Sequence, residues 1–233
     1  MTATVLRADR DGVTELRLHR PEARNALSTQ VLTELCDRLD SVHDDPAVRA
    51  VFLSGTGEVF CAGADVREFG PNPPADASLA RIRLVVEVLR RIRELPQPTL
   101  AAVHGPAVGA GWGLALACDL CFATGSATFT LPEVAKGYRL PAPLVTRLAQ
   151  VAGPVRAADL VYGGGTYTAG DAVAAGCVTR LSPGAEELRA TAWDFCRTLA
   201  ERPRRSVATA TEPLRALAGA GPFPPSQLFW TEE

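Results

Sequence analysis

The stretch that decides the fold is HGPAVGAGWGL, at residues 104–114. It follows the apolar run 99–103, which is predicted to be a buried strand, and it leads into a predicted helix of small residues at 110–117. Small residues let a ligand approach the backbone closely and leave N–H groups unscreened. At a helix start, those N–H groups also lie at the positive end of the helix dipole. The stretch therefore predicts a strand–turn–helix unit that favours a negatively charged atom.

A second turn of the same kind is FCAGADV, at residues 60–66, which follows a predicted buried strand at 48–53. Two such turns facing each other would form an oxyanion hole from backbone N–H groups alone. A dinucleotide site is the rival interpretation, but the pattern G-x-G-x-x-G breaks at Leu114, which stands where the last glycine is required. We therefore favour the oxyanion hole.

The remaining hydrophobic patterns predict strands that alternate with amphipathic helices, which is typical of an α/β fold. A β-hairpin is expected at 5–7 and 13–18, around the turn Asp11-Gly12, and Ser28 is expected to cap a helix over 29–42. We expect residues 1–183 to form the core and residues 184–233 a separate helical packing unit. The other predicted strands cover 120–123, 127–130 and 178–181, and the other predicted helices cover 78–95, 143–152, 154–162, 168–175, 184–201 and 203–218.

Composition excludes several classes of function. The net charge of −2 gives no electrostatic reason to expect nucleic acid or an anionic membrane as a partner. No signal peptide or membrane-spanning run is recognised, so we expect a cytoplasmic protein. Cys118 and Cys121 form a C-x-x-C, but both lie in apolar runs and are expected to be buried and inert. No cluster has the spacing of a metal site, and no histidine pairs with a nucleophile.

A third segment, FTLPEV at residues 129–134, contains a glutamate that has two interpretations. Thr130 and Glu133 have the spacing of a helix capping box, with Pro132 in the first turn, which would make the glutamate structural. Alternatively, Glu133 is a catalytic acid or base.

Together, these segments and HRPEARNAL, at residues 19–27, resemble the crotonase (enoyl-CoA hydratase/isomerase) superfamily. The resemblance covers most of the chain. It implies a spiral of ββα units with a helical C-terminal region, an acyl-CoA substrate, and assembly as a homo-trimer or hexamer. It implies no cofactor beyond the coenzyme A of the substrate.

The resemblance also implies site residues. Its two oxyanion N–H donors fall on Ala64 and Ala110, and its catalytic carboxylate falls on Glu133. The residues that match the family's binding surface for coenzyme A and substrate are Arg24, Ala26, Ala62, Gly63, Asp65, Val66 and Gly109. We add Trp112, which is expected to belong to the core or to the pocket wall. Tyr138 and Arg139 are further candidates near the pocket.

One position departs from the family. Hydratases carry a second glutamate, which here falls on Gly113. A single carboxylate suffices to move a double bond, so we favour isomerisation of a 3-enoyl thioester over hydration. Glu133 would then need a pKa raised by apolar surroundings. A hydratase, lyase or decarboxylase acting on a specialised thioester stays open, and so does a non-catalytic acyl-CoA-binding helper subunit. If the alignment is right, a glutamate placed at Gly113 should create hydratase activity.

Overall fold

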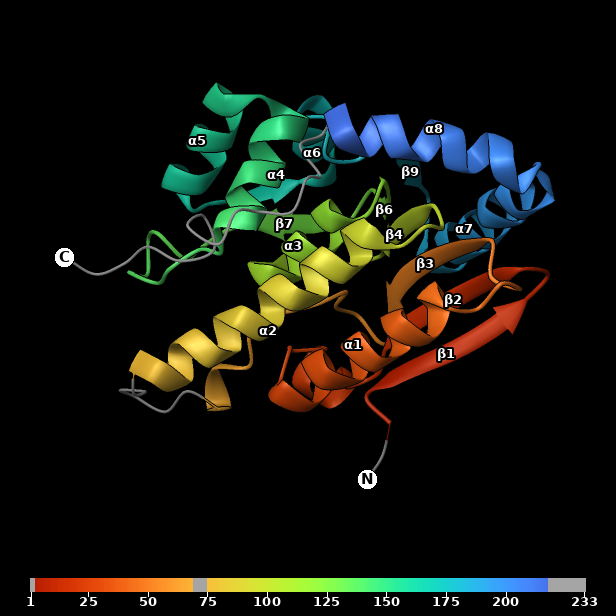
Figure 1. Ribbon diagram of the computed structural model, residues 1–233. Coiled ribbons are helices and arrows are strands. Elements are labelled where there is room, and N and C mark those ends of the chain that lie inside the picture. The colour runs from red at the N-terminus through yellow and green to blue at the C-terminus, as the bar shows by residue number, and fades with distance from the viewer. Residues whose placement is uncertain (1–2, 69–74, 218–233) are drawn as a thin grey trace.

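The computed structural model describes residues 3–68 and 75–217, and it contains two β-sheets (Figure 1). The larger sheet has six strands in the order β1-β2-β3-β4-β6-β9. β1 and β2 are antiparallel, and each later strand is parallel to its neighbour. The predicted α/β class is confirmed. The strands are β1 (Val5–Arg10), β2 (Val13–Leu18), β3 (Ala50–Gly55), β4 (Thr99–Val103), β6 (Leu120–Thr124) and β9 (Arg180–Ser182).

The predicted hairpin forms one edge of this sheet. Asp11 and Gly12 both have positive φ, at 52° and 76°, and they join β1 to β2 with Arg10 opposite Val13. Positive φ at both central residues is the requirement of the two-residue turn whose twist matches that of the strands. The Asp-Gly pair therefore fixes the register of the edge.

The smaller sheet has the strand order β5-β7-β8 and lies beside the end of α3 (Ala110–Ala117) (Figure 1). β5 and β7 are parallel, whereas β7 and β8 are antiparallel. The sequence predicted β7 but neither of its partners. The three strands are β5 (Ala107–Val108), β7 (Thr128–Thr130) and β8 (Thr166–Thr168).

One face of the larger sheet carries the main core, covered by α1 (Thr29–His43), α2 (Ala75–Glu94) and α3 (Figure 1). The hydroxyl of Ser28 accepts the N–H of Val31 at 3.3 Å, so the predicted cap of α1 is confirmed. The buried side chains of α1 recur at helical spacing and face the sheet.

The opposite face is covered by α7 (Ala185–Glu201). Trp193 of α7 packs edge-on against Phe52 of β3, with 5.0 Å between ring centroids. Leu188 and Cys196 join the same core. The residues after Pro183 therefore begin with a helix that shares a core with the sheet. We expected these residues to pack as a separate unit, and for α7 the structure differs from that expectation. Residues 218–233 of the expected C-terminal region lie outside the described residues.

The remaining helices complete the protein: α4 (Ala142–Ala152), α5 (Pro154–Gly163), α6 (Ala169–Ala174), α8 (Arg204–Leu217), and the short 3-10 helices η1 (Pro21–Ala23) and η2 (Val66–Glu68). No helix in the described ranges is long and apolar enough to cross a membrane. All six cysteines fall in the described part of the chain, where they are buried and not disulfide-bonded.

Candidate functional site

Two turns that the sequence singled out lie against each other. The N–H of Cys61 donates to the carbonyl of Pro106 at 3.1 Å, and the N–H of Val108 donates to the carbonyl of Cys61 at 2.9 Å. A Cβ added to Gly111 would overlap the carbonyl oxygen of Cys61. The small residues therefore permit direct contact between the two backbones.

The closest approach is at the two glycines that precede Ala64 and Ala110. Gly63 and Gly109 have positive φ, at 83° and 53°, a conformation that favours glycine. A Cβ at Gly63 would lie 2.6 Å from the carbonyl oxygen of Val108 and 3.7 Å from the nitrogen of Ala110. The backbone that leads into Ala64 is thus adjacent to the N–H of Ala110.

The N–H groups of Ala64 and Ala110 have no acceptor among the described residues. Leu27 bonds with the residues on either side of Ala64, accepting from Asp65 at 3.2 Å and donating to Gly63 at 2.8 Å. This parallel bridge leaves the N–H of Ala64 on the other side of its strand. Ala110 opens α3, whose first N–H groups have no partner within the helix.

Glu133 lies against the same turn. A Cβ at Gly109 would overlap Glu133 Oε1. The approach is fixed by β7, because the N–H of Gly109 donates to the carbonyl of Thr130 at 2.8 Å. The carbonyl of Glu133 in turn accepts the N–H of Tyr138 at 2.7 Å, which closes a turn around the glutamate. The smaller sheet therefore brings the carboxylate beside the adjacent backbone turns.

The carboxylate of Glu133 is buried and poorly satisfied. Its Oε2 has no hydrogen-bond partner in the described part of the protein. Burial raises the pKa of Glu133 above its ordinary value, and a hydrogen bond from its own backbone N–H and the charge of Lys136 offset only part of this rise. A carboxylate of this kind is suited to accept a proton.

The capping-box interpretation of Glu133 is wrong. Thr130 ends β7, and its hydroxyl lies 3.1 Å from that of Thr166 in β8. Residues 131–140 form turns and irregular structure, so no helix begins there for Glu133 to cap. The T-x-x-E spacing arises where a strand passes into a turn.

Gly113 lies among leucines. A Cβ added there would be 2.8 Å from Leu144 Cδ1 of α4 and 3.7 Å from Leu89 Cδ2 of α2. The position of the expected second glutamate therefore adjoins apolar side chains that fill the space a longer residue would need.

The predicted coenzyme A surface is partly exposed. Arg24 and Val66 are exposed, Ala62 is half-buried, and Ala26 is buried. The N–H of Ala62 donates to the carbonyl of Arg24 at 3.0 Å, so the Arg24 loop adjoins the turn that contains Ala64.

Asp65 has a structural environment. Its carboxylate is buried and pairs with Arg67 at 2.9 Å and with Arg20 at 3.1 Å. The hydrogen bond from Arg67 is the main cause that lowers its pKa, to about 2. The side chain of Asp65 is therefore committed to these arginines.

Two aromatic candidates differ in position. Trp112 is 1% exposed and packs against Phe129 and Tyr167, with ring centroids 5.4 and 6.4 Å away. It supports α3 from within the core, which agrees with the first of the two expected positions, core or pocket wall. Tyr138 is largely exposed, so nothing prevents its contact with a bound molecule.

Asn25 is a supporting residue that the sequence interpretation missed. It is fully buried and has a positive φ of 54°. Its side chain accepts the N–H of Arg20 at 2.9 Å and donates to the carbonyls of Thr56 and Val59 at 2.9 and 2.7 Å. Asn25 therefore pins the Arg24 loop to the segment that leads into the second turn. The signal was present in HRPEARNAL, as a polar residue just before two buried apolar ones.

No group of histidine, cysteine, aspartate and glutamate side chains within the described ranges has the arrangement of a metal site. The site therefore consists of backbone N–H groups and one buried carboxylate.

The chain is similar to known proteins in both sequence and fold. The family model for enoyl-CoA hydratase/isomerase matches residues 8–220. An enoyl-CoA isomerase/hydratase of Mycosarcoma maydis is 34% identical over 212 residues, which cover 87% of this chain and 75% of that protein. A 4-chlorobenzoyl coenzyme A dehalogenase of Arthrobacter is 35% identical over 197 residues, covering 83% and 71%. The crystal structure of an enoyl-CoA hydratase of Mycobacterium smegmatis matches with a TM-score of 0.84 at 30% identity, covering 94% of this chain and 89% of that chain.

Proposed function

Because the chain belongs to the enoyl-CoA hydratase/isomerase family, whose members form the crotonase superfamily, we propose that its site binds an acyl-CoA thioester with the carbonyl oxygen between the N–H groups of Ala64 and Ala110. The observation that carries this proposal is the placement of two unpaired N–H groups on adjacent turns, beside an unpaired buried carboxylate. Backbone donors need no side chain, so alanine at both positions leaves the hole usable.

We propose that Glu133 is the base. Its carboxylate takes a proton from C2 of a 3-enoyl thioester, and the electron pair of the broken C–H bond moves toward the thioester carbonyl. The two N–H groups stabilise the negative charge that develops on the carbonyl oxygen. Glu133 then returns the proton to C4, the double bond moves to C2–C3, and the enzyme is regenerated. The raised pKa of Glu133 favours this role, because it makes the carboxylate a stronger base than an ordinary glutamate.

The surroundings of Gly113 support isomerisation over hydration. Hydration needs a second polar group to help activate water, and the space beside Gly113 is lined by Leu144 and Leu89. The apolar wall favours a reaction in which a single carboxylate moves one proton. One alternative to an isomerase is a hydratase, lyase or decarboxylase. The other alternative is a helper subunit that binds thioesters without turnover. The similarity to a 4-chlorobenzoyl coenzyme A dehalogenase adds aromatic thioesters to the candidate substrates.

The remaining features of the proposal concern binding and assembly. We propose that the exposed Arg24 loop and the backbone of residues 62–66 contact coenzyme A, with Tyr138 at the edge of the site. We propose that no other cofactor takes part, that the chain assembles as a homo-trimer or hexamer, and that it acts in the cytoplasm. Sedimentation analysis tests the assembly, since a monomer at all concentrations would contradict it.

One assay set tests the reaction. 3-Enoyl, 2-enoyl and 3-hydroxyacyl thioesters are offered to the wild type and to Glu133→Gln, which keeps the shape of the side chain. We expect isomerisation by the wild type and its loss in the variant. Rapid hydration of the 2-enoyl thioester would contradict the preference for isomerisation. Tight thioester binding without turnover of any of the three would favour the helper subunit.

A further inference from the structure

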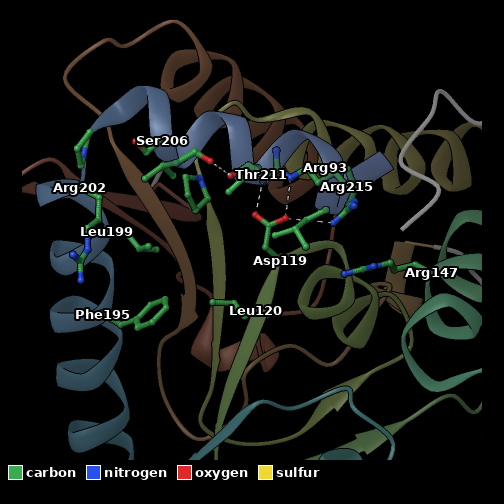
Figure 2. A pocket seen from close by; sticks show the side chains of 15 residues that line it. Arg93, Asp119, Leu120, Arg147, Phe195, Leu199, Arg202, Ser206, Thr211 and Arg215 are labelled. Carbon is green, nitrogen blue, oxygen red and sulfur yellow. Dashed lines mark hydrogen bonds and ion pairs between the residues drawn. The ribbon is translucent and has the colours of Figure 1, made fainter. Parts of the chain in front are cut away.

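A pocket of about 610 Å³ lies between α7, α8 and the amino-terminal ends of β4 and β6 (Figure 2). Its volume is in the range of small-molecule sites, about 300–1,000 Å³. Pro98 and Leu120 line it at the strand starts, whereas the candidate acyl-CoA site follows the carboxyl ends of β3 and β4. The two sites therefore lie at opposite ends of the strands of the larger sheet.

One end of this pocket is charged. Asp119 pairs with Arg215 at 2.5 Å and with Arg93 at 3.5 Å, and it also accepts the N–H and hydroxyl of Thr99 at 2.8 and 2.9 Å. Figure 2 shows Arg93, Asp119, Arg147 and Arg215 gathered on the same side of the pocket. Two guanidinium groups thus share one carboxylate, and the third, that of Arg147, donates to the carbonyl of Leu116 at 2.9 Å.

The guanidinium donors of this cluster differ in how many acceptors they have. Arg215 donates to Asp119 and to the carbonyls of Leu95 and Gln97. The side chain of Arg93 is 10% exposed, and its Nη2 is buried without a hydrogen-bond partner in the described part of the chain. A buried donor that is left unpaired costs free energy, and the cost is larger for a charged group. Arg93 is therefore the position where an acceptor would stabilise the pocket most.

The electrostatics point to an anion as that acceptor. Burial lowers the pKa of Arg93 to about 10, and the positive charges of Arg147 and Arg215 act in the same direction. Burial also lowers the pKa of Arg147. Among the described groups that act on Arg93, Asp119 is the carboxylate, and it is already shared with Arg215. A second negative charge would balance the excess of positive charge at this end of the pocket.

The rest of the pocket is mainly apolar, although Arg202, Ser206 and Thr211 also line it. Phe195 and Leu199 of α7 form one wall, Val207 and Leu214 of α8 form another, and Leu120 lies between the charged end and Phe195. An inorganic anion would leave these walls uncovered, whereas an apolar body would fill them. We propose that this pocket binds a small carboxylate with an apolar body, whose head group pairs with the guanidinium of Arg93 at the charged end.

Calorimetric titration of the full-length protein with octanoate tests this proposal. We expect saturable binding by the wild type, and binding weaker by about tenfold or more in Arg93→Met, which keeps the stem and removes the charge. Octanamide, which has the same body without the charge, should bind the wild type more weakly by a similar factor. Arg205→Met is the matched control, because Arg205 lies on α8, is exposed and does not line the pocket.

A second variant separates this pocket from the acyl-CoA site. Val207→Trp fills the pocket from α8 and should abolish octanoate binding while thioester turnover is kept. Octanoate binding that survives both Arg93→Met and Val207→Trp would belong to another site and would overturn the proposal. Absence of binding to the wild type would overturn it as well, and would leave water as the partner of Arg93.

Discussion

Glu15 and Glu133 are both glutamates withdrawn from solvent, yet the protein treats their charges in opposite ways. Glu15 is fully buried in β2, and its carboxylate accepts from Arg17, Arg189 and Ser54 at 2.6–3.0 Å. These hydrogen bonds outweigh the effect of burial and lower its pKa to about 2. Glu133 has no such partner at Oε2, and burial raises its pKa.

The difference shows that burial alone does not decide what a carboxylate does. Glu15 stays ionised because its partners stabilise the charge, so it contributes to the fold and has no proton to exchange near neutral pH. Glu133 is held with only partial compensation beside two unpaired backbone N–H groups. An arrangement that costs stability is expected where chemistry requires it. Four predictions test the comparison.

The largest effect is expected at Glu133 itself. Glu133→Gln removes the proposed base and should lower kcat/KM for the thioester by roughly 10²–10⁴-fold, the usual contribution of a general base. Thermal stability should be kept or raised, because an unpaired buried carboxylate is replaced by a neutral amide. Steady-state kinetics and a thermal melt measure the two effects. The control is Glu186→Gln, an exposed position of α7. Equal loss of activity and of folding would argue against a catalytic role.

Gly113→Glu adds a further buried carboxylate. The sequence predicts that it creates hydratase activity, but its Cβ would lie 2.8 Å from Leu144 Cδ1. We expect destabilisation above the about 1–3 kcal/mol typical of overpacking, because a charge is buried as well. Hydration of a 2-enoyl thioester should then require Leu144→Ala as a second change. Chemical denaturation and a hydratase assay follow both variants. A stable, active single variant would show that Leu144 does not limit this space.

Glu15→Gln removes the compensated carboxylate. We expect a loss of about 1–3 kcal/mol in the free energy of unfolding, less than for a fully buried ion pair, because Arg17 and Arg189 reach water. Thioester turnover should not change, since the side chain of Glu15 pairs with Arg189 of α7, on the face of the sheet opposite α1, α2 and α3. Urea unfolding with parallel kinetics measures both effects. A fall in kcat/KM comparable to that of Glu133→Gln would remove the distinction between the two residues.

The smallest effect is a difference in pH dependence. The folded pKa of Glu15 is lowered to about 2, so its stabilisation is present above about pH 4.5 and is lost as pH falls toward 2. The folded pKa of Glu133 is raised, so its contribution is present below about pH 4.5 and is lost as pH rises through the folded value.

The stability difference between Glu15→Gln and the wild type should therefore change with pH below about pH 4.5, and the difference between Glu133→Gln and the wild type should change above it. Turnover should rise with pH through the pKa of Glu133, because the base must be ionised. A rate that falls over this range would contradict the assignment.

Several features of the fold and of the candidate site could be predicted from local sequence. The hairpin follows from Asp11-Gly12, the cap of α1 from Ser28, and the close backbone contact from the glycines of two turns. These features depend on the conformational preferences of a few adjacent residues.

The features that were missed depend on distant contacts. β5 is two residues long and exists because Ala107 and Val108 pair with Phe129 and Thr130. Leu144 fills the space beside Gly113 from 31 positions along the chain. The capping-box spacing at Glu133 was misleading because strand pairing decides the local structure there.

The central claim is that Glu133 removes a proton from C2 while the N–H groups of Ala64 and Ala110 hold the thioester carbonyl. The most direct measurement is proton exchange at C2 of a saturated acyl-CoA in D₂O, followed by NMR, because exchange needs the base and the oxyanion hole but no particular net reaction. The account predicts deuterium at C2 with the wild type and exchange reduced by roughly 10²-fold or more in Glu133→Gln. Exchange at the same rate in both proteins, or none by a wild type that binds the thioester, would contradict it.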